Sequence, residues 1–238
     1  MMPWWIALQF LSSLPVRLRR MPTPAETGRS LLWYPAVGLL FAAVLASVDS
    51  LLAGSPLLLH GAILLAVWIF LTGGLHLDGF ADTADAWVGG YGDRERTLAI
   101  MKDPRSGPMA VVALIVLLLL KFTALAAVLQ AAPGDHWWIV PVLGRATLLG
   151  VFLTTPYVRA GGLGEALANH LPRTAGWVVL AGCLLASWLS LGSVLLAGIA
   201  AFAWLRWLLL RRLGGTTGDT AGAMLECLEV VLLVGLAL

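Results

Sequence analysis

Charged residues and cysteines are scarce in this chain, and each scarcity excludes a class of protein. Charged residues make up 12% and hydrophobic residues 60% of the 238 positions, whereas a soluble domain carries about 25% charged residues. The only cysteines, Cys183 and Cys227, lie in apolar segments, so neither a disulfide framework nor a thiolate metal site is expected. No basic segment precedes the first apolar run, so we expect no cleavable signal peptide. The composition therefore predicts an integral membrane protein.

Long apolar runs predict an all-α, polytopic bundle of about seven transmembrane helices, since a span needs about 20 apolar residues. The expected spans are residues 31–53, 57–75, 108–131, 137–155, 175–190, 192–210 and 219–238. The apolar tract from Ala175 to Leu210 exceeds one crossing, so it must turn back near residues 191–193. No linker interrupts these runs, and we expect one membrane domain over residues 1–238.

The N-terminal segment, residues 1–16, begins with an apolar run that is too short to span but contains Trp4, Trp5 and Phe10. We therefore expect an interfacial helix at the membrane surface. Other tryptophans fall at the ends of the expected spans, which is typical of an aromatic belt. These are Trp33, Trp137, Trp138, Trp177, Trp188, Trp204 and Trp207.

Lysine and arginine occur in alternate connections only. The segment before the first span carries them, as do the second, fourth and sixth connections, whereas the first, third and fifth connections carry none. Because positive residues near span ends stay in the cytoplasm, the N-terminus and the polar connections are expected there, with the C-terminus outside. The sequence thus predicts a multi-pass protein of the cytoplasmic (inner) membrane. We expect the lipid bilayer but no nucleic acid as a partner; oligomer formation is left open.

Three carboxylates stand out in the second connection, residues 76–107, which we expect to be a cytoplasmic acidic loop carrying the catalytic residues. If the segment is helical, steps of four and three residues place Asp78, Asp82 and Asp85 on one face. Carboxylates held together repel, and a divalent cation removes that cost. Oxygen ligands suit Mg²⁺, Mn²⁺ or Ca²⁺. A solvated helix face outside the membrane is the alternative. His76, two residues before Asp78, is equally consistent with a structural hydrogen bond or with catalysis.

The same connection continues into alternating charges, at Asp93, Arg96, Lys102, Asp103 and Arg105. Alternating charge is often a solvated face. However, metal-binding carboxylates with cations nearby are also what a metal–diphosphate complex requires, because the cations neutralise the remaining phosphate charge. We therefore predict that these five residues contact a phosphate-bearing substrate.

A second acidic site begins the last expected span, where Asp219 lies in a glycine-rich segment, residues 214–223. Three roles are open for Asp219: a helix cap, a further metal ligand beside Asp78 and Asp82, or a group that orients those ligands. As a ligand, its carboxylate should lie within one water-bridged contact of that pair, on the order of 8 Å.

Four charged residues fall inside expected spans, where charges are costly and mark either a function or a buried partner. Their sequence positions suggest ion pairs, either Glu226 with Arg145 or Glu229 with Lys121. We consider such pairing at least as well supported as a catalytic role.

Several motifs together resemble the cobalamin synthase family of adenosylcobinamide-GDP ribazoletransferases. They are G-G-L-H-L-D-G-F-A-D-T-A-D-A at 73–86, G-D-R-E-R at 92–96, I-M-K-D-P-R-S-G at 100–107, T-G-D-T-A-G-A at 217–223 and T-P-Y-V-R-A-G-G-L-G at 155–164. The N-terminal segment departs from the family's basic–Pro–Val–Pro signature, since it reads Leu14-Pro-Val-Arg-Leu-Arg-Arg20. The resemblance implies that adenosylcobinamide-GDP is joined to α-ribazole, or to its 5′-phosphate, with release of GMP, and that Mg²⁺ is the cofactor.

The residues fit such a reaction. A ribazole hydroxyl would attack the phosphorus attached to cobinamide, at a metal held by Asp78, Asp82 and Asp85. Lys102 and Arg105 would bind the remaining phosphate oxygens, and Asp82 or Asp85 would accept the proton. Two other functions stay open: a lipid phosphotransferase of the CDP-alcohol type, and a cation transporter. A transporter predicts carboxylates near the bilayer midplane, whereas this sequence places them at one end of a span.

Overall fold

The structure is a computed structural model that describes residues 1–131 and 136–238, and within these residues it contains helices but no β-strand. The prediction of an all-α fold is confirmed. The elements are α1 (Met2–Leu11), α2 (Pro24–Ser30), η1 (Leu31–Trp33), α3 (Tyr34–Leu51), α4 (Leu57–Thr72), α5 (Leu75–Gly89), α6 (Arg94–Ile100), α7 (Pro108–Ala131), η2 (His136–Ile139), α8 (Val140–Thr154), α9 (Leu163–His170), α10 (Arg173–Leu191), α11 (Val194–Leu213) and α12 (Gly218–Ala237).

Six helical stretches in the described residues are long and apolar enough to cross a membrane. They are Pro24–Leu51, Pro108–Ala131, His136–Thr154, Arg173–Leu191, Val194–Leu213 and Gly218–Ala237. The pair α4 and α5 supplies a seventh candidate, although it is bent by 89°. All expected spans therefore correspond to helices, and the predicted turn in the long apolar tract lies at Gly192, between α10 and α11.

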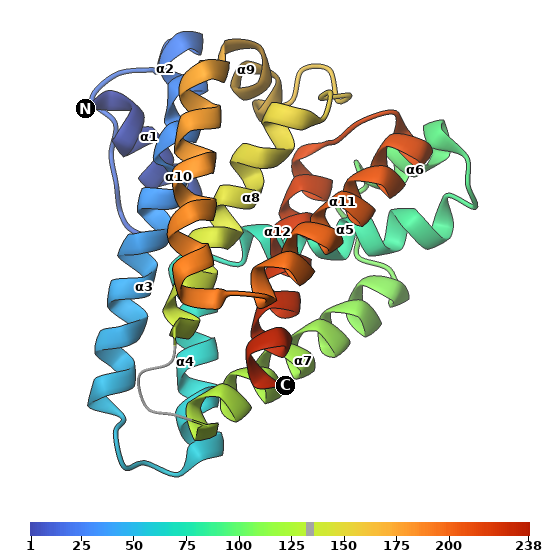
Figure 1. Cartoon of the computed structure of the whole chain (residues 1–238). Coiled ribbons are helices and arrows are strands. Elements are labelled where there is room, and N and C mark those ends of the chain that lie inside the picture. Colours follow the sequence, from blue (N-terminus) through green and yellow to red (C-terminus); the bar gives the residue numbers. More distant parts are fainter. Residues whose placement is uncertain (132–135) are drawn as a thin grey trace.

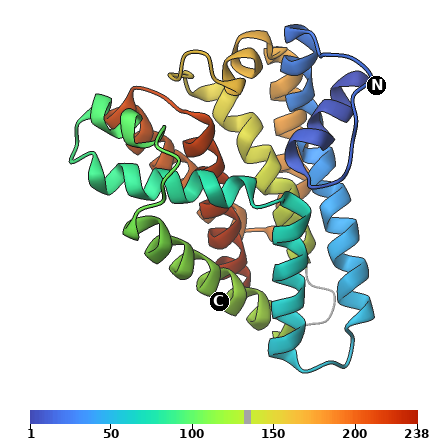
Figure 2. The same ribbon diagram turned by 180° about the vertical axis from the view of Figure 1, so that it is seen from behind.

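The break between α4 and α5 determines where the acidic residues lie. Gly73 and Gly74 both have positive φ values, 63° and 71°, which glycine adopts without steric cost. Ser13, just after α1, binds the last turn of α4: its backbone N–H donates to the Leu71 carbonyl at 2.9 Å and its hydroxyl to the Phe70 carbonyl at 2.5 Å. As a result, α5 does not continue the crossing made by α4 but runs across the molecule (Figure 2).

The segment expected to form a loop over residues 76–107 is mostly helical. It contains α5 and α6, and only the short stretches around them are turns. The four- and three-residue steps between Asp78, Asp82 and Asp85 are compatible with a helix. Asp93 is the N-cap of α6 and accepts a hydrogen bond from the Arg96 N–H at 2.6 Å.

Helix α12 forms the centre of the bundle, packed against α5, α7, α8 and α11 (Figure 1). Helices α10 and α11 lie at the periphery, and their large apolar side chains are exposed, as helices facing lipid require. The exposed side chains include Trp177, Trp188, Trp204 and Trp207, which agrees with anchoring rather than ligand binding. Trp137 is 3% exposed and packs inside the bundle, so the anchoring expected of it is wrong.

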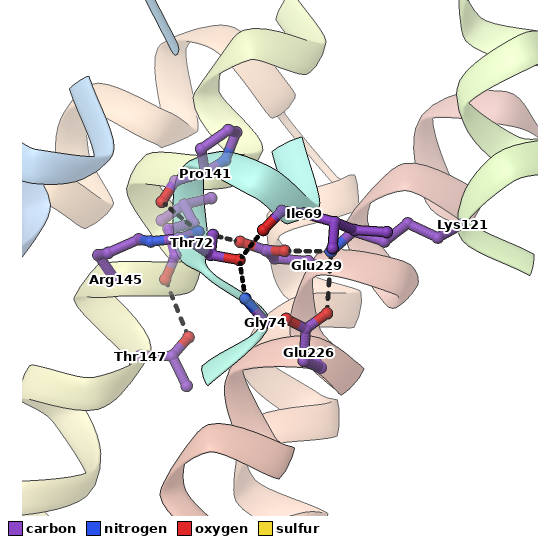
Figure 3. A network of polar contacts seen from close by, with 10 residues as sticks. Ile69, Thr72, Gly74, Lys121, Pro141, Arg145, Thr147, Glu226 and Glu229 are labelled. Atoms are coloured by element: carbon purple, nitrogen blue, oxygen red, sulfur yellow. Dashed lines mark hydrogen bonds and ion pairs between the residues drawn. The ribbon is translucent and has the colours of Figure 1, made fainter. Parts of the chain in front are cut away.

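Beside the break between α4 and α5, buried charges join α12 to α7 and α8 (Figure 3). Lys121 binds both Glu226, at 2.9 Å, and Glu229, at 2.5 Å, while Arg145 binds the other oxygen of Glu229. The expected pair of Glu229 with Lys121 is confirmed. The expected pair of Glu226 with Arg145 is wrong, because Glu229 lies between the two cations and Glu226 reaches only Lys121. The four formal charges cancel, which lowers the cost of their burial.

Candidate active site

A cavity of about 520 Å³ lies where α5 crosses the start of α12. We call it the central cavity. Asp78 and Asp219 both line it, one from each helix, with Lys102 from the turn after α6 and Arg159 from the connection between α8 and α9. Aromatic side chains form much of the remaining wall: Phe10, Tyr34, Phe152 and Tyr157. The structure thus brings together the two acidic motifs, which the sequence separates by more than a hundred residues.

The two helices cross with their backbones almost in contact. A Cβ placed on Gly79 would lie 2.9 Å from the Asp219 Cα, closer than real side chains come. Asp219 is not the cap of α12: Thr217 takes that position and accepts a hydrogen bond from the Thr220 N–H at 3.2 Å. The capping role considered for Asp219 is therefore wrong, and its carboxylate is free to bind Arg159, whose Nη1 donates to Oδ2 at 2.7 Å.

Asp82 lies one turn after Asp78 on α5 and is half-buried. Burial raises the pKa of Asp82 to about 6, and the charges of Asp78, Asp219 and Asp85 add to the rise, while Arg159 opposes it. The charges of the other three aspartates therefore reach Asp82 across the helix crossing. A cation bound beside Asp82 would favour its ionised form.

Asp85, the third carboxylate of α5, is already engaged. Its Oδ2 accepts a hydrogen bond from the Gly107 N–H, and its Oδ1 accepts one from the Ala110 N–H at 2.9 Å. Gly107 comes just before α7 and Ala110 lies in its first turn, where N–H groups have no partner within the helix. Asp85 therefore ties α5 to the start of α7. Its predicted roles as a metal ligand and as a base stay predictions.

Of the five residues predicted to bind substrate, the structure brings only Lys102 to the central cavity. Asp103 and Arg105 pair with each other at 2.7 Å, and the hydrogen bond from Arg105 lowers the pKa of Asp103 to about 2. Asp93 caps α6, and the Arg96 guanidinium lies over the exposed ring of Tyr91 at 5.1 Å from its centroid. Substrate binding by Asp93, Arg96, Asp103 and Arg105 stays a prediction.

His76 lies at the start of α5 and lines the cavity while being 4% exposed. Neither of its ring nitrogens has a hydrogen-bond partner within the described residues. Within the described residues, His76 therefore makes no structural hydrogen bond, which was one of the two roles considered for it. An unpaired buried imidazole is costly unless a ligand completes it.

Arg159 and Tyr157 were not predicted as site residues. Their segment bridges to the start of α12: the Val158 N–H donates to the Thr216 carbonyl at 2.9 Å, which brings Arg159 to Asp219. The Tyr157 ring stacks on Phe152, with 6.0 Å between centroids. The signal available in the sequence was the 155–164 motif, with an arginine in an otherwise apolar, glycine-rich stretch.

Comparison with known proteins agrees with the geometry. Residues 3–237 match a family described as cobalamin-5-phosphate synthase. Proteins named adenosylcobinamide-GDP ribazoletransferase align over the whole chain: one from Pseudomonas fluorescens (strain Pf0-1) is 63% identical over 242 residues and fully covered, and one from Pseudomonas savastanoi pv. phaseolicola is 59% identical over 243 residues and also fully covered. No solved structure matches the chain. The chain belongs to the cobalamin-5-phosphate synthase family and is a membrane-embedded transferase of cobalamin synthesis.

Proposed function

We propose that this protein transfers the cobinamide phosphate of adenosylcobinamide-GDP to α-ribazole, or to its 5′-phosphate, and releases GMP. The observation that carries the proposal is the meeting of Asp78, Asp219, Lys102 and Arg159 in one cavity. Asp219 and Arg159 are half-buried, whereas Asp78 and Lys102 are exposed. Two carboxylates beside two cations suit a diphosphate and a divalent metal, and they suit neither a lipid tail nor a conducting pore. The family match also disfavours the lipid phosphotransferase and the cation transporter.

We propose Mg²⁺ as the cofactor, and the donor set fits it in part. Within the described residues, no three His, Cys, Asp or Glu side chains are close enough together to hold a metal by themselves. Mg²⁺ is commonly bound through one or two carboxylates, with substrate phosphates and waters as the other ligands. Asp78 with Asp82 on α5, or Asp78 with Asp219 across the helix crossing, would supply one or two of its ligands, and substrate phosphates and waters would supply the rest. When bound, Mg²⁺ would withdraw charge from the diphosphate and stabilise the leaving phosphate.

The remaining steps are assigned to the residues that line the cavity. Lys102 and Arg159 would bind phosphoryl oxygens and hold the phosphorus in place as negative charge builds on the leaving group. Arg159 pairs with Asp219 at 2.7 Å, so it neutralises this carboxylate before substrate arrives. Asp82 or His76 would accept the proton of the attacking hydroxyl, Asp82 because its pKa is raised to about 6 and His76 because its ring nitrogens are unpartnered in the cavity wall. Asp85 is less suited to that role, since backbone amides occupy both of its oxygens.

We further propose that the cavity faces the cytoplasm in the inner membrane. The helices that follow or precede arginine-bearing segments, α2 and α9, lie at one end of the molecule, whereas the turn between α3 and α4, which has no lysine or arginine, lies at the other (Figure 1). This arrangement follows the distribution expected of cytoplasmic and external connections.

The direct test uses the purified full chain in detergent or in lipid vesicles, with adenosylcobinamide-GDP and α-ribazole. GMP and a cobalamin product should appear in equal amounts when Mg²⁺ is present, and both should disappear when the metal is chelated. GMP without a joined product would indicate hydrolysis, and no GMP would contradict the proposal.

A further inference from the structure

One side of the central cavity is formed by two aromatic rings that carry no charge. Phe152 of α8 and Tyr157, in the connection between α8 and α9, both line the cavity. Their ring centroids lie 6.0 Å apart and their planes differ by 21°. Phe152 is 5% exposed, whereas Tyr157 is half-buried. We call these two nearly parallel rings the aromatic wall, an apolar surface in a cavity that also holds carboxylates and cations.

The Tyr157 ring is held in place by its surroundings. A Cβ placed on Gly164 would overlap the ring, and a Cβ placed on Gly162 would overlap its hydroxyl oxygen. The chain before the ring is tied to the segment that leads into α12, because the Thr216 N–H donates to the Pro156 carbonyl at 2.8 Å. The glycines of the 155–164 motif therefore leave room for an aromatic side chain whose position is set before a substrate arrives.

The aromatic wall and the phosphate-binding groups share one cavity. Tyr157 lies two residues before Arg159, and both line the cavity together with Asp219 and Lys102. The volume of about 520 Å³ is within the range of small-molecule sites. A nucleoside whose base packs on the wall therefore keeps its ribose in the same cavity as the phosphate that is transferred.

The lining of the cavity suits an apolar base better than guanine. Guanine carries a carbonyl, an amino group and a ring N–H, and a site that recognises it needs hydrogen-bonding groups for them. Among the described residues, no serine, threonine, asparagine or glutamine side chain lines the cavity, whereas Leu148 and Leu167 do. The base of α-ribazole is a dimethylbenzimidazole, which has neither a carbonyl nor an amino group. Stacking and apolar contact are the interactions that such a base can make.

We infer that the aromatic wall stacks against the base of the acceptor α-ribazole, so that Tyr157 selects an acceptor with an apolar aromatic base. The inference rests on the proposed function. Stacking on an aromatic side chain contributes to base binding without any hydrogen bond. The acceptor base remains attached to the product after transfer, whereas the guanosine of the donor leaves with GMP. A fixed apolar wall beside the phosphate site fits the partner that stays.

The test measures GMP release and determines the KM for α-ribazole and the KM for adenosylcobinamide-GDP separately. Tyr157→Leu should raise the KM for α-ribazole by about tenfold or more, because the stacking surface is lost. The KM for the donor should stay close to that of the wild type. Tyr157→Phe keeps the ring and should restore the KM for α-ribazole. Phe70→Leu is the control, since this ring is 75% exposed and does not line the cavity.

The opposite split, with a higher KM for the donor alone, would show that the wall contacts the guanine or the corrin and would overturn the inference. Equal rises in both KM values, or a lower kcat at unchanged KM, would overturn it too, because Tyr157 would then act by placing Arg159. Unchanged constants would do the same. If Tyr157→Leu does not fold, Phe152→Leu removes the other ring and should give the same acceptor-specific rise. No GMP release by the wild type would instead contradict the proposed function itself.

Discussion

At the scale of single residues, the site depends on which carboxylates are already paired. Asp85 has both oxygens committed to backbone amides at the start of α7, and Asp103 is paired with Arg105. Asp78 and Asp82 have no such partners in the described part of the chain, and Asp219 has only Arg159. A partly buried carboxylate without a partner is costly, so it favours binding a cation. This division separates candidate metal ligands from positioning residues more sharply than sequence spacing does.

Asp82→Asn should reduce turnover by about 100-fold or more, because it removes a charge that would stabilise the metal–diphosphate complex. The side chain keeps its size, so the protein should remain folded in the membrane. GMP release should be measured across a Mg²⁺ titration, together with the rise in unfolding temperature that Mg²⁺ produces. Glu95→Gln, an exposed change on α6, is the control. Near-normal turnover of Asp82→Asn at limiting Mg²⁺ would show that Asp82 is not a ligand.

Asp85→Ala should act first on stability. Loss of the two hydrogen bonds to the start of α7 should cost about 1–2 kcal/mol, as for other helix caps. Thermal unfolding in detergent measures this loss, and activity per folded molecule is measured below the transition. If activity falls by orders of magnitude while the unfolding temperature is unchanged, the sequence-based prediction of Asp85 as a ligand or base is supported instead.

At the scale of elements, the crossing of α5 and α12 creates the site. Helix α5 can cross the molecule because the Gly73–Gly74 break turns the chain by 89°, and it can approach α12 because Gly79 has no side chain. The sequence predicts α12 as a span and, on the condition that the acidic segment is helical, the alignment of Asp78 with Asp82; it otherwise expects a loop where α5 lies. It does not predict the crossing, because two glycines are equally consistent with a loop, and the contact between α5 and α12 joins residues far apart in the chain.

Gly79→Ala tests the crossing. The added methyl group would lie 2.9 Å from the Asp219 Cα, so the helices must separate. Displacement of one acidic motif from the other should reduce turnover by up to about 100-fold, while overpacking should cost about 1–3 kcal/mol of stability. Gly182→Ala is the matched control, because a Cβ there meets nothing within 4 Å. Equal turnover in the two variants would show that the close approach is not needed.

At the scale of the whole molecule, the sequence is informative where the membrane imposes a rule. Span lengths, the turn at Gly192 and the exposed tryptophans follow from bilayer thickness and its interfaces, and the structure confirms them. Partners within the bundle follow from packing between distant segments. The sequence therefore identified the buried charges but paired Arg145 with the wrong glutamate, and it missed Arg159, whose partner lies 60 residues away.

Orientation in the membrane follows from charge rather than from packing. Positive residues occur only at one set of connections, so the end that carries α2 should face the cytoplasm and the turn between α3 and α4 should face outward. Single cysteines at two exposed positions, Ala25→Cys at the start of α2 and Ala53→Cys after α3, report the two ends. Cys183 and Cys227 are first replaced by alanine.

A membrane-impermeant maleimide should label Ala25→Cys in inverted vesicles but not in intact cells, and Ala53→Cys in intact cells but not in inverted vesicles. Labelling after detergent solubilisation controls for reactivity. The result bears on substrate supply as well as on topology, because the central cavity adjoins α1 and the segment around α9, at the same end as α2. A nucleotide-linked donor made in the cytoplasm can reach the acidic cluster only if that end faces inward. The opposite labelling pattern would place Asp78 and Asp219 outside and would contradict both the orientation and the proposed reaction.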